Sequence, residues 1–323
     1  MDMFESRINM EPIQESIREV KQEIAKIIVG QEKMIDMLIA AILAKGHVLI
    51  EGFPGLAKTL TAKLLAKTID ADFSRIQFTP DLMPSDVLGT SVFNFQDSSF
   101  DYKKGPIFSN IILIDEINRA PAKTQAALFE VMEERQVTNE GILYPMDEPF
   151  FIMATQNPID LEGTYRLPEA QMDRFIFKIK VDYPTLEEEV QILNNSQEGR
   201  GGSNIGGIAA ILNQSKIAEY QNLVSQVHVE PKLMQFIAEI SSKTRAHKDI
   251  HIGASPRASL ALLHGSKALA VIRGRDFITP EDITDLTNPV LAHRISMSPE
   301  KEMEGASPEA VVESLVRSLE IPR

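Results

Sequence analysis

Short apolar runs alternate with amphipathic stretches from the start of the chain to about Pro184. The runs are rich in branched residues and have the length of strands that are buried on both faces of a sheet. Between them, apolar residues recur every three or four positions, as Ile17, Val20 and Ile24 do, and this spacing predicts helices. Alternating strands and helices predict a three-layer α/β domain with a parallel sheet. The predicted strands are 48–50, 73–78, 111–115, 150–157 and 175–181.

Glycine and proline mark the ends of the predicted helices in this part. A helix over 13–29 is interrupted at Gly30, and a second helix over 31–45 is closed by Gly46. Pro121 begins a helix that continues to about Glu134. Two segments of alternating character, 88–105 and 135–146, predict β-hairpins inserted between these elements.

The pattern changes after Pro184 and predicts a second domain. A helical stretch is followed by SQEGRGGSNIGG, which is rich in glycine and reads as a flexible linker. Beyond it the pattern shows only helices, several of which begin at a proline preceded by Ser255, Thr279 or Ser307 as N-cap. We therefore divide the chain into an α/β core at 1–190, a linker at 191–207 and a helical domain at 208–323.

Composition narrows the class of protein. The 323 residues contain no cysteine, which excludes disulfides and thiolate chemistry. No apolar run is long enough to span a bilayer, and MDMFESRINM lacks the features of a signal peptide, so we expect a cytoplasmic protein without membrane insertion. The formal net charge of −13, with scattered Lys and Arg, disfavours nucleic acid as a partner.

The segment GFPGLAKT at 52–59 follows a predicted strand and precedes a helix. It has the form of a phosphate-binding loop, in which backbone N–H groups and a helix N-terminus face an anion. Lys58 would reach the β- and γ-phosphates, and the Thr59 hydroxyl would bind Mg²⁺. Ala57 replaces the usual glycine before the lysine, and we expect a right-handed backbone there, which alanine tolerates.

Two carboxylates, Asp115 and Glu116, end the apolar strand IILID. Asp115 can hold the water shell of Mg²⁺, and Glu116 can act as general base toward the attacking water. An acidic pair after a strand is often only the solvated start of a loop. In combination with the lysine loop on another strand of the same sheet, it predicts an ATP-hydrolysing site.

These motifs, together with DEINRAPAKTQAALFEVMEERQV and ATQNPIDLEGTYRLPEAQMDRF, closely resemble the MoxR family of AAA+ ATPases. The resemblance extends from IVGQE at 28–32 to GASPRASLAL at 253–262. It implies a P-loop AAA+ core with a parallel sheet, an all-α lid domain, and assembly into a ring, usually a hexamer, with ATP at the subunit interfaces. It further implies a chaperone that remodels partner complexes, often with von Willebrand factor A domain proteins, and assists metal or cofactor insertion.

The resemblance also assigns individual residues. Asn157 would be sensor 1, which orients the water beside the γ-phosphate, although Asn before proline is also a common cap. Arg174 would be the arginine finger of a neighbouring subunit, with Arg166 as a rival and a surface ion pair as the plain alternative. Arg257 would be sensor 2 of the lid, or would pair with a nearby carboxylate. The nucleotide contacts would be Val29, Gly30 and Gln31 at the adenine and Gly52, Phe53, Pro54, Gly55, Leu56, Ala57, Lys58, Thr59 and Leu60 in the loop.

Two other functions stay open at this point. A nucleic-acid motor or loader could be built on the same core, but the net negative charge of the chain argues against this function. A nucleotide-gated binding module with negligible turnover is the other, and Ala57 is the only residue that favours it. The hairpin at 88–105 carries Phe93, Phe95, Phe100 and Tyr102, which could contact a partner or pack against the core.

Overall fold

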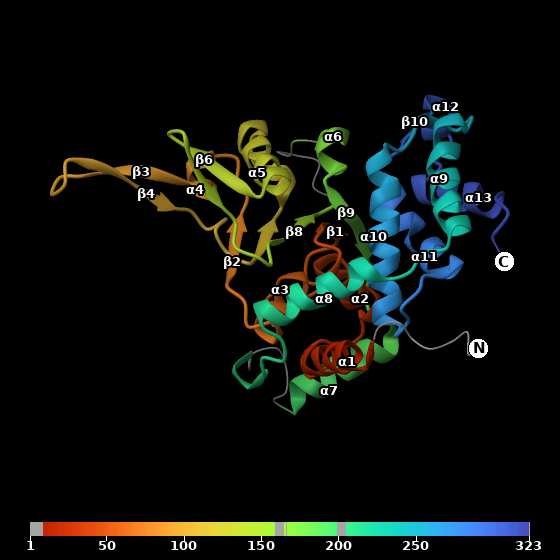
Figure 1. Cartoon of the computed structure of the whole chain (residues 1–323), viewed down its shortest axis with the longest axis horizontal. Helices are drawn as coiled ribbons and strands as arrows, with labels where there is room; N and C mark the ends of the chain where they lie inside the picture. Colours follow the sequence, from red (N-terminus) through yellow and green to blue (C-terminus); the bar gives the residue numbers. More distant parts are fainter. Residues whose placement is uncertain (1–8, 159–164, 166, 199–204, 323) are drawn as a thin grey trace.

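The N-terminal part of the chain folds around a five-stranded parallel sheet (Figure 1). The structure is a computed structural model and describes all residues except 1–8, 159–164, 166, 199–204 and 323. The strand order is β2-β5-β8-β1-β9, with every neighbouring pair parallel. All five predicted strands are confirmed: β1 (His47–Gly52), β2 (Phe73–Gln77), β5 (Ile111–Asp115), β8 (Phe151–Gln156) and β9 (Phe175–Val181).

Helices cover both faces of this sheet, so the predicted three-layer core is confirmed. Side chains alternate along β5: Ile111 and Leu113 pack toward α1 (Glu11–Ala25), α2 (Glu32–Leu43) and α3 (Lys58–Thr68). Ile112 and Ile114 pack on the opposite face with α5 (Ala122–Glu134). Every residue of β5 is buried, which is the reason its sequence is almost entirely apolar.

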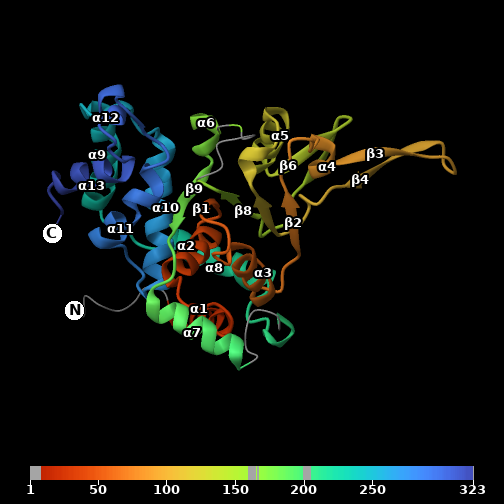
Figure 2. The same cartoon turned by 180° about the vertical axis from the view of Figure 1, so that it is seen from behind.

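Both predicted hairpins are present, and one of them projects far from the body (Figures 1 and 2). Strands β3 (Gly89–Asn94) and β4 (Ser99–Lys104) follow the short helix α4 (Pro84–Leu88), and β6 (Gln136–Asn139) pairs with β7 (Ile142–Pro145). At the outer end of the first hairpin the Phe93 ring contacts Phe95 and Phe100, with centroids 5.1 and 5.2 Å apart. Phe95 is 88% exposed, so these rings pack on one another and not against the core.

The start of the predicted linker was wrong, because residues 191–197 continue a helix. Helix α7 (Leu186–Gln197) begins with a capping box between Thr185 and Glu188. After the 3₁₀ turn η2 (Ile205–Gly207), the chain lies against the core: backbone N–H groups of Ile211 and Leu212 donate to the Thr68 carbonyl. Helix α8 (Gln214–Gln226) follows and is tied to α2 through a hydrogen bond from Gln221 to the Ile42 carbonyl.

The C-terminal domain consists mainly of helices, as predicted, with one addition. It contains α9 (Pro231–Ala246), α10 (Pro256–Ile272), α11 (Pro280–Leu291), α12 (Pro299–Met303) and α13 (Pro308–Arg317). The expectation that no strand occurs here was wrong, because β10 (Ile250–Ile252) and β11 (Ser296–Met297) form a small antiparallel pair. These strands are too short to show a period-2 pattern. Ser255 and Ser307 cap α10 and α13 as predicted.

This lid domain packs on the edge strand β9 and on α2, and one continuous hydrophobic cluster extends through core and lid. Within the described ranges, the helices lack the length and apolar content needed to cross a membrane.

Candidate nucleotide-binding site

The phosphate-binding loop lies where β1 ends and α3 begins. Gly55 has φ of +87°, a conformation that glycine adopts without strain and other residues rarely adopt. Helix α3 starts at Lys58, so its N-terminal N–H groups point toward the loop. The Lys58 ammonium donates to the Gly52 carbonyl at 2.5 Å, which folds the lysine back over the loop. The loop therefore has the geometry of an anion site.

The backbone of Ala57 differs from the sequence-based expectation. We predicted a right-handed conformation, but Ala57 has φ of 54° and ψ of 17°, in the left-handed region. Ala57 is the N-cap of α3, the last residue before the helix begins. Alanine at this position carries a steric cost that glycine would not have.

Two parallel strands bring the acidic pair to the loop. The Thr155 hydroxyl at the end of β8 donates to Asp115 Oδ1 at 3.1 Å and accepts from the Glu116 N–H at 3.1 Å. The carboxyl ends of parallel strands lie at the same edge of a sheet, so the residues that end β1, β5 and β8 lie close to one another. A cavity of about 400 Å³ opens there, lined by Pro54, Gly55, Leu56, Ala57, Lys58, Thr59, Leu60, Arg75, Gln77, Asp115, Glu116, Thr155 and Asn157.

Arg75 and Gln77 on β2 are site residues that the sequence analysis missed. Arg75 Nε donates to Asp115 Oδ2 at 2.6 Å, and Gln77 Nε2 donates to Glu116 Oε2 at 2.8 Å. The two residues are two positions apart near the end of a strand, so their side chains point to the same face. That spacing in FSRIQF was the signal that could have identified them.

The charges in the cavity fit a metal-bound polyphosphate. Partial burial lowers the pKa of Lys58, and the nearby Asp115 and Glu116 carboxylates oppose this shift. Thr59 and Asp115 offer hard oxygen ligands. The described residues contain no group of three or more acidic, His or Cys side chains that could hold a metal by themselves. Mg²⁺ is usually held by one or two side chains together with phosphate oxygens and water, and Thr59 and Asp115 could supply those side chains.

The predicted adenine segment contacts the phosphate loop from the side. Gln31 Nε2 donates to the Leu56 carbonyl at 3.0 Å, while Gln31 Oε1 is buried without a hydrogen-bond partner. Phe53 stacks on Tyr183 with ring centroids 5.0 Å apart. Gly30 lies against the side chain of Glu188 on α7. The cavity around Lys58 is not lined by Val29, Gly30, Gln31, Gly52 or Phe53.

Arg174 and Arg257 lie together, away from this cavity. Arg174 follows α6 (Glu169–Met172) and Arg257 begins α10, yet both guanidinium groups bind the single carboxylate of Glu133 on α5. Neither arginine is among the residues that line the phosphate cavity. The carboxylate alternative for Arg257 is therefore the contact observed, and Arg174 likewise forms an ion pair, with the same carboxylate. Arg166 lies outside the described residues.

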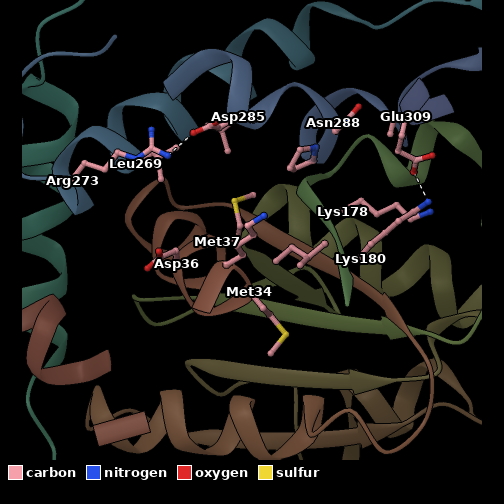
Figure 3. A pocket seen from close by; sticks show the side chains of 15 residues that line it. Met34, Asp36, Met37, Lys178, Lys180, Leu269, Arg273, Asp285, Asn288 and Glu309 are labelled. Carbon is pink, nitrogen blue, oxygen red and sulfur yellow. Dashed lines mark hydrogen bonds and ion pairs between the residues drawn. The ribbon is translucent and has the colours of Figure 1, made fainter. Parts of the chain in front are cut away.

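A second cavity, of about 420 Å³, lies between α2, β9 and the lid and contains none of the predicted site residues. Figure 3 shows that charged side chains at its rim pair within the chain, Lys180 with Glu309 and Arg273 with Asp285. Met34, Met37 and Leu269 supply its apolar wall. This cavity belongs to the joint between core and lid and not to the phosphate site.

Known proteins share both the sequence and the fold of this chain. Residues 47–177 match the model of the ATPase family associated with various cellular activities (AAA), and residues 242–315 match an AAA lid domain. Chaperone MoxR1 of Mycobacterium tuberculosis is 41% identical over 93% of this chain and 81% of its own length. The uncharacterized protein YeaC of Bacillus subtilis is 43% identical over 93% of both chains.

Protein MoxR of Methylorubrum extorquens is 29% identical over 93% of this chain and 92% of its own length. The crystal structure of an ATPase candidate from Cytophaga hutchinsonii superposes with a TM-score of 0.89 at 42% identity. That superposition covers 98% of this chain and 97% of the other.

Proposed function

Because the chain belongs to the MoxR family of AAA ATPases, we propose that it hydrolyses ATP with Mg²⁺ and uses the energy to remodel a partner protein complex. The observation that carries the proposal is the single cavity lined by Lys58, Thr59, Asp115, Glu116 and Asn157. These residues come from the ends of two strands, β5 and β8, and from the N-terminus of α3, and each of them was predicted from the sequence to bind phosphate, metal or water.

Each group has a task in the proposed reaction. Lys58 and the N-terminus of α3 would hold the β- and γ-phosphates, and Thr59 and Asp115 would hold Mg²⁺, which would neutralise charge on the phosphates. Glu116 accepts a proton from the water that attacks the γ-phosphorus, while the bond to the β–γ bridging oxygen breaks. Gln77 donates to one oxygen of Glu116 and orients the carboxylate, and Asn157 orients the water.

A ring, usually a hexamer in this family, would complete the site. Arg174 and Arg257 are held by Glu133 at a distance from their own phosphate cavity. Guanidinium groups that do not reach the nucleotide of their own subunit can serve the nucleotide of the next one, as an arginine finger does. This placement supports ATP sites at the subunit interfaces, with Arg174 as finger and Arg257 beside it.

The projecting hairpin supports a role in binding a client. Phe93, Phe95 and Phe100 form an exposed aromatic cluster at its outer end, and exposed aromatic clusters are typical of protein interaction sites. One relative has the name Chaperone MoxR1. We propose that the protein acts in the cytoplasm as a chaperone that assists assembly, or metal or cofactor insertion, with a von Willebrand factor A domain protein as the candidate partner.

Two variants test the proposed site. Glu116→Gln should lower the turnover number for phosphate release by about 100-fold or more, because a general base supplies a factor of that order, and should leave ATP binding intact. Lys58→Ala should abolish binding of a fluorescent ATP analogue. Unchanged hydrolysis in Glu116→Gln would contradict the role of this residue. A wild-type protein that binds no ATP would contradict the whole proposal.

A further inference from the structure

The guanidinium of Arg75 is bound to the carboxylate that is expected to hold the metal. Arg75 Nε donates to Asp115 Oδ2 at 2.6 Å, and the Thr155 hydroxyl donates to Asp115 Oδ1 at 3.1 Å. Each oxygen of the Asp115 carboxylate therefore already accepts a hydrogen bond from the chain. A divalent cation and a guanidinium group repel each other when they lie beside the same carboxylate. Arg75 and the metal therefore compete for Asp115.

Of the two partners in this ion pair, Arg75 is the one that can move. Its side chain is 48% exposed, whereas that of Asp115 is 11% exposed. Arg75 lies on β2, the edge strand of the sheet, and Asp115 ends β5, which is flanked by a strand on each side. A long and exposed arginine side chain has many rotamers available, so it can leave Asp115 while the backbone stays in place.

Arg75 also has hydrogen-bond donors to offer to a phosphate. Its Nη2 donates to Gln77 Oε1 at 3.2 Å, so two of its five N–H donors are used. The other three make no hydrogen bond to a residue that the structure describes. Arg75 lines the same cavity as Lys58 and Thr59 of the phosphate loop. A planar guanidinium in this position can bind a phosphate through two N–H groups at once.

The charges around the cavity indicate why a second cation is needed. The ionisable side chains that line it are two cations, Lys58 and Arg75, and two carboxylates, Asp115 and Glu116. While Arg75 is bound to Asp115, the two charges offset each other, and Lys58 is the one cation of this lining that is left for phosphate. ATP carries one phosphate group more than ADP and therefore more negative charge, which Lys58 alone neutralises less well.

We propose that Arg75 exchanges Asp115 for the terminal phosphate of ATP when the metal–nucleotide complex binds, an inference that rests on the proposed function. Without nucleotide, Arg75 neutralises Asp115 and holds its carboxylate in place. In the complex, Asp115 faces the metal and Arg75 turns to the γ-phosphate beside Lys58. ADP lacks this phosphate, so Arg75 is a residue that distinguishes the triphosphate from the diphosphate.

Nucleotide affinities with Mg²⁺ test the contact with the terminal phosphate. Arg75→Gln should weaken the binding of a non-hydrolysable ATP analogue by about tenfold or more, because hydrogen bonds between charged groups contribute a factor of that order. It should weaken the binding of ADP by less than about twofold, since ADP does not reach Arg75. Arg75→Lys keeps the charge but not the planar fork, and its affinity for the analogue should lie between those of Arg75→Gln and wild type.

A matched control removes the same charge elsewhere. Arg317→Gln changes an arginine that is 82% exposed and does not line the cavity, so it should leave both affinities unchanged. Isothermal titration calorimetry measures the affinities, and circular dichroism confirms that each variant is folded.

A metal-free titration separates the exchange from a role in which Arg75 only neutralises Asp115. In EDTA, Asp115→Asn removes the charge that holds Arg75, so Arg75 should be available to the analogue. Arg75→Gln in this background should then weaken the binding of the analogue by about tenfold. If Arg75 only neutralises Asp115, the same substitution has no effect there, because the charge to be neutralised is already gone.

Equal losses of affinity for the analogue and for ADP in Arg75→Gln would overturn the inference, as would analogue binding as tight as that of wild type. It is equally overturned if binding in the Asp115→Asn background does not depend on Arg75. Each of these results, with a wild type that binds the analogue, leaves the proposed ATP site intact. A wild type that binds neither nucleotide refutes the proposed function itself.

Discussion

Arg294 joins the lid to the core, and its replacement gives the sharpest test of the structure. The residue follows α11 in the lid, and its side chain is 2% exposed. Its guanidinium makes five hydrogen bonds, which use all five donors: Asp173 Oδ1 at 2.7 Å and the carbonyls of Val290, Ile176, Asp173 and Phe175. Asp173 also accepts from the Ser255 hydroxyl, which caps the helix of Arg257.

The expected cost of Arg294→Met follows from these contacts. Removing one partner of a buried ion pair typically destabilises a protein by about 3–5 kcal/mol, because the other charge stays buried without compensation. Here the substitution leaves the Asp173 carboxylate and four carbonyl groups without this donor. A loss of about 3–5 kcal/mol is a large part of the 5–15 kcal/mol that is typical of folded proteins.

Urea denaturation followed by circular dichroism measures this loss. The same substitution at Arg317, which is 82% exposed and pairs with Glu313 at 3.6 Å, is the matched control and should cost less than about 0.5 kcal/mol. Asp173→Leu combined with Arg294→Met should destabilise by less than the sum of the single changes, because the two side chains interact directly. A loss below about 1 kcal/mol in Arg294→Met would refute the reasoning about uncompensated burial.

Three further outcomes follow from individual residues. Ala57→Gly should keep ATP affinity within about threefold and should not lower the free energy of unfolding, since glycine relieves the positive φ; a tenfold loss in an ATP titration would contradict this. Burial lowers the pKa of His47 to about 3, so between pH 6.5 and 3 the unfolded chain binds a proton that the folded chain does not. The free energy of unfolding should therefore fall by about 1.4 kcal/mol for each pH unit lowered in this window, and urea titrations of His47→Gln should show a shallower dependence. Phe95→Ser should change stability by less than about 0.5 kcal/mol, whereas Phe129→Ser, 1% exposed, should cost about 3 kcal/mol or more in the same assay.

The sheet and the helices of the core followed from local pattern. The apolar run at 111–115 is entirely buried, and its neighbour β8 is buried over five of its six residues. The loop at 52–59 was recognisable because glycine, lysine and threonine occupy fixed positions between a strand and a helix. The pair Asp115 and Glu116 was recognisable from its place at a strand end.

Predictions failed where the conformation of the backbone, or the pairing partner of a strand, depends on distant parts of the chain. The left-handed conformation of Ala57 depends on how the loop joins β1 to α3, which the local propensity of alanine does not reveal. Residues 191–197 were assigned to the linker because glycines follow closely, although the helix with its capping box continues through them. Strands β10 and β11 form through a pairing across more than 40 positions that no local period marks.

The sequence by itself determined the α/β core, the helical lid, the phosphate loop and the acidic pair, because each depends on residue types at short and fixed spacing. Only the tertiary structure decided what the charged side chains face. It placed Arg75 on Asp115, and Arg174 with Arg257 on Glu133, and it buried Arg294 against Asp173, which is 121 positions away. An ion pair forms between groups that folding brings within a few ångströms of each other. The spacing of two residues along the chain does not determine that distance.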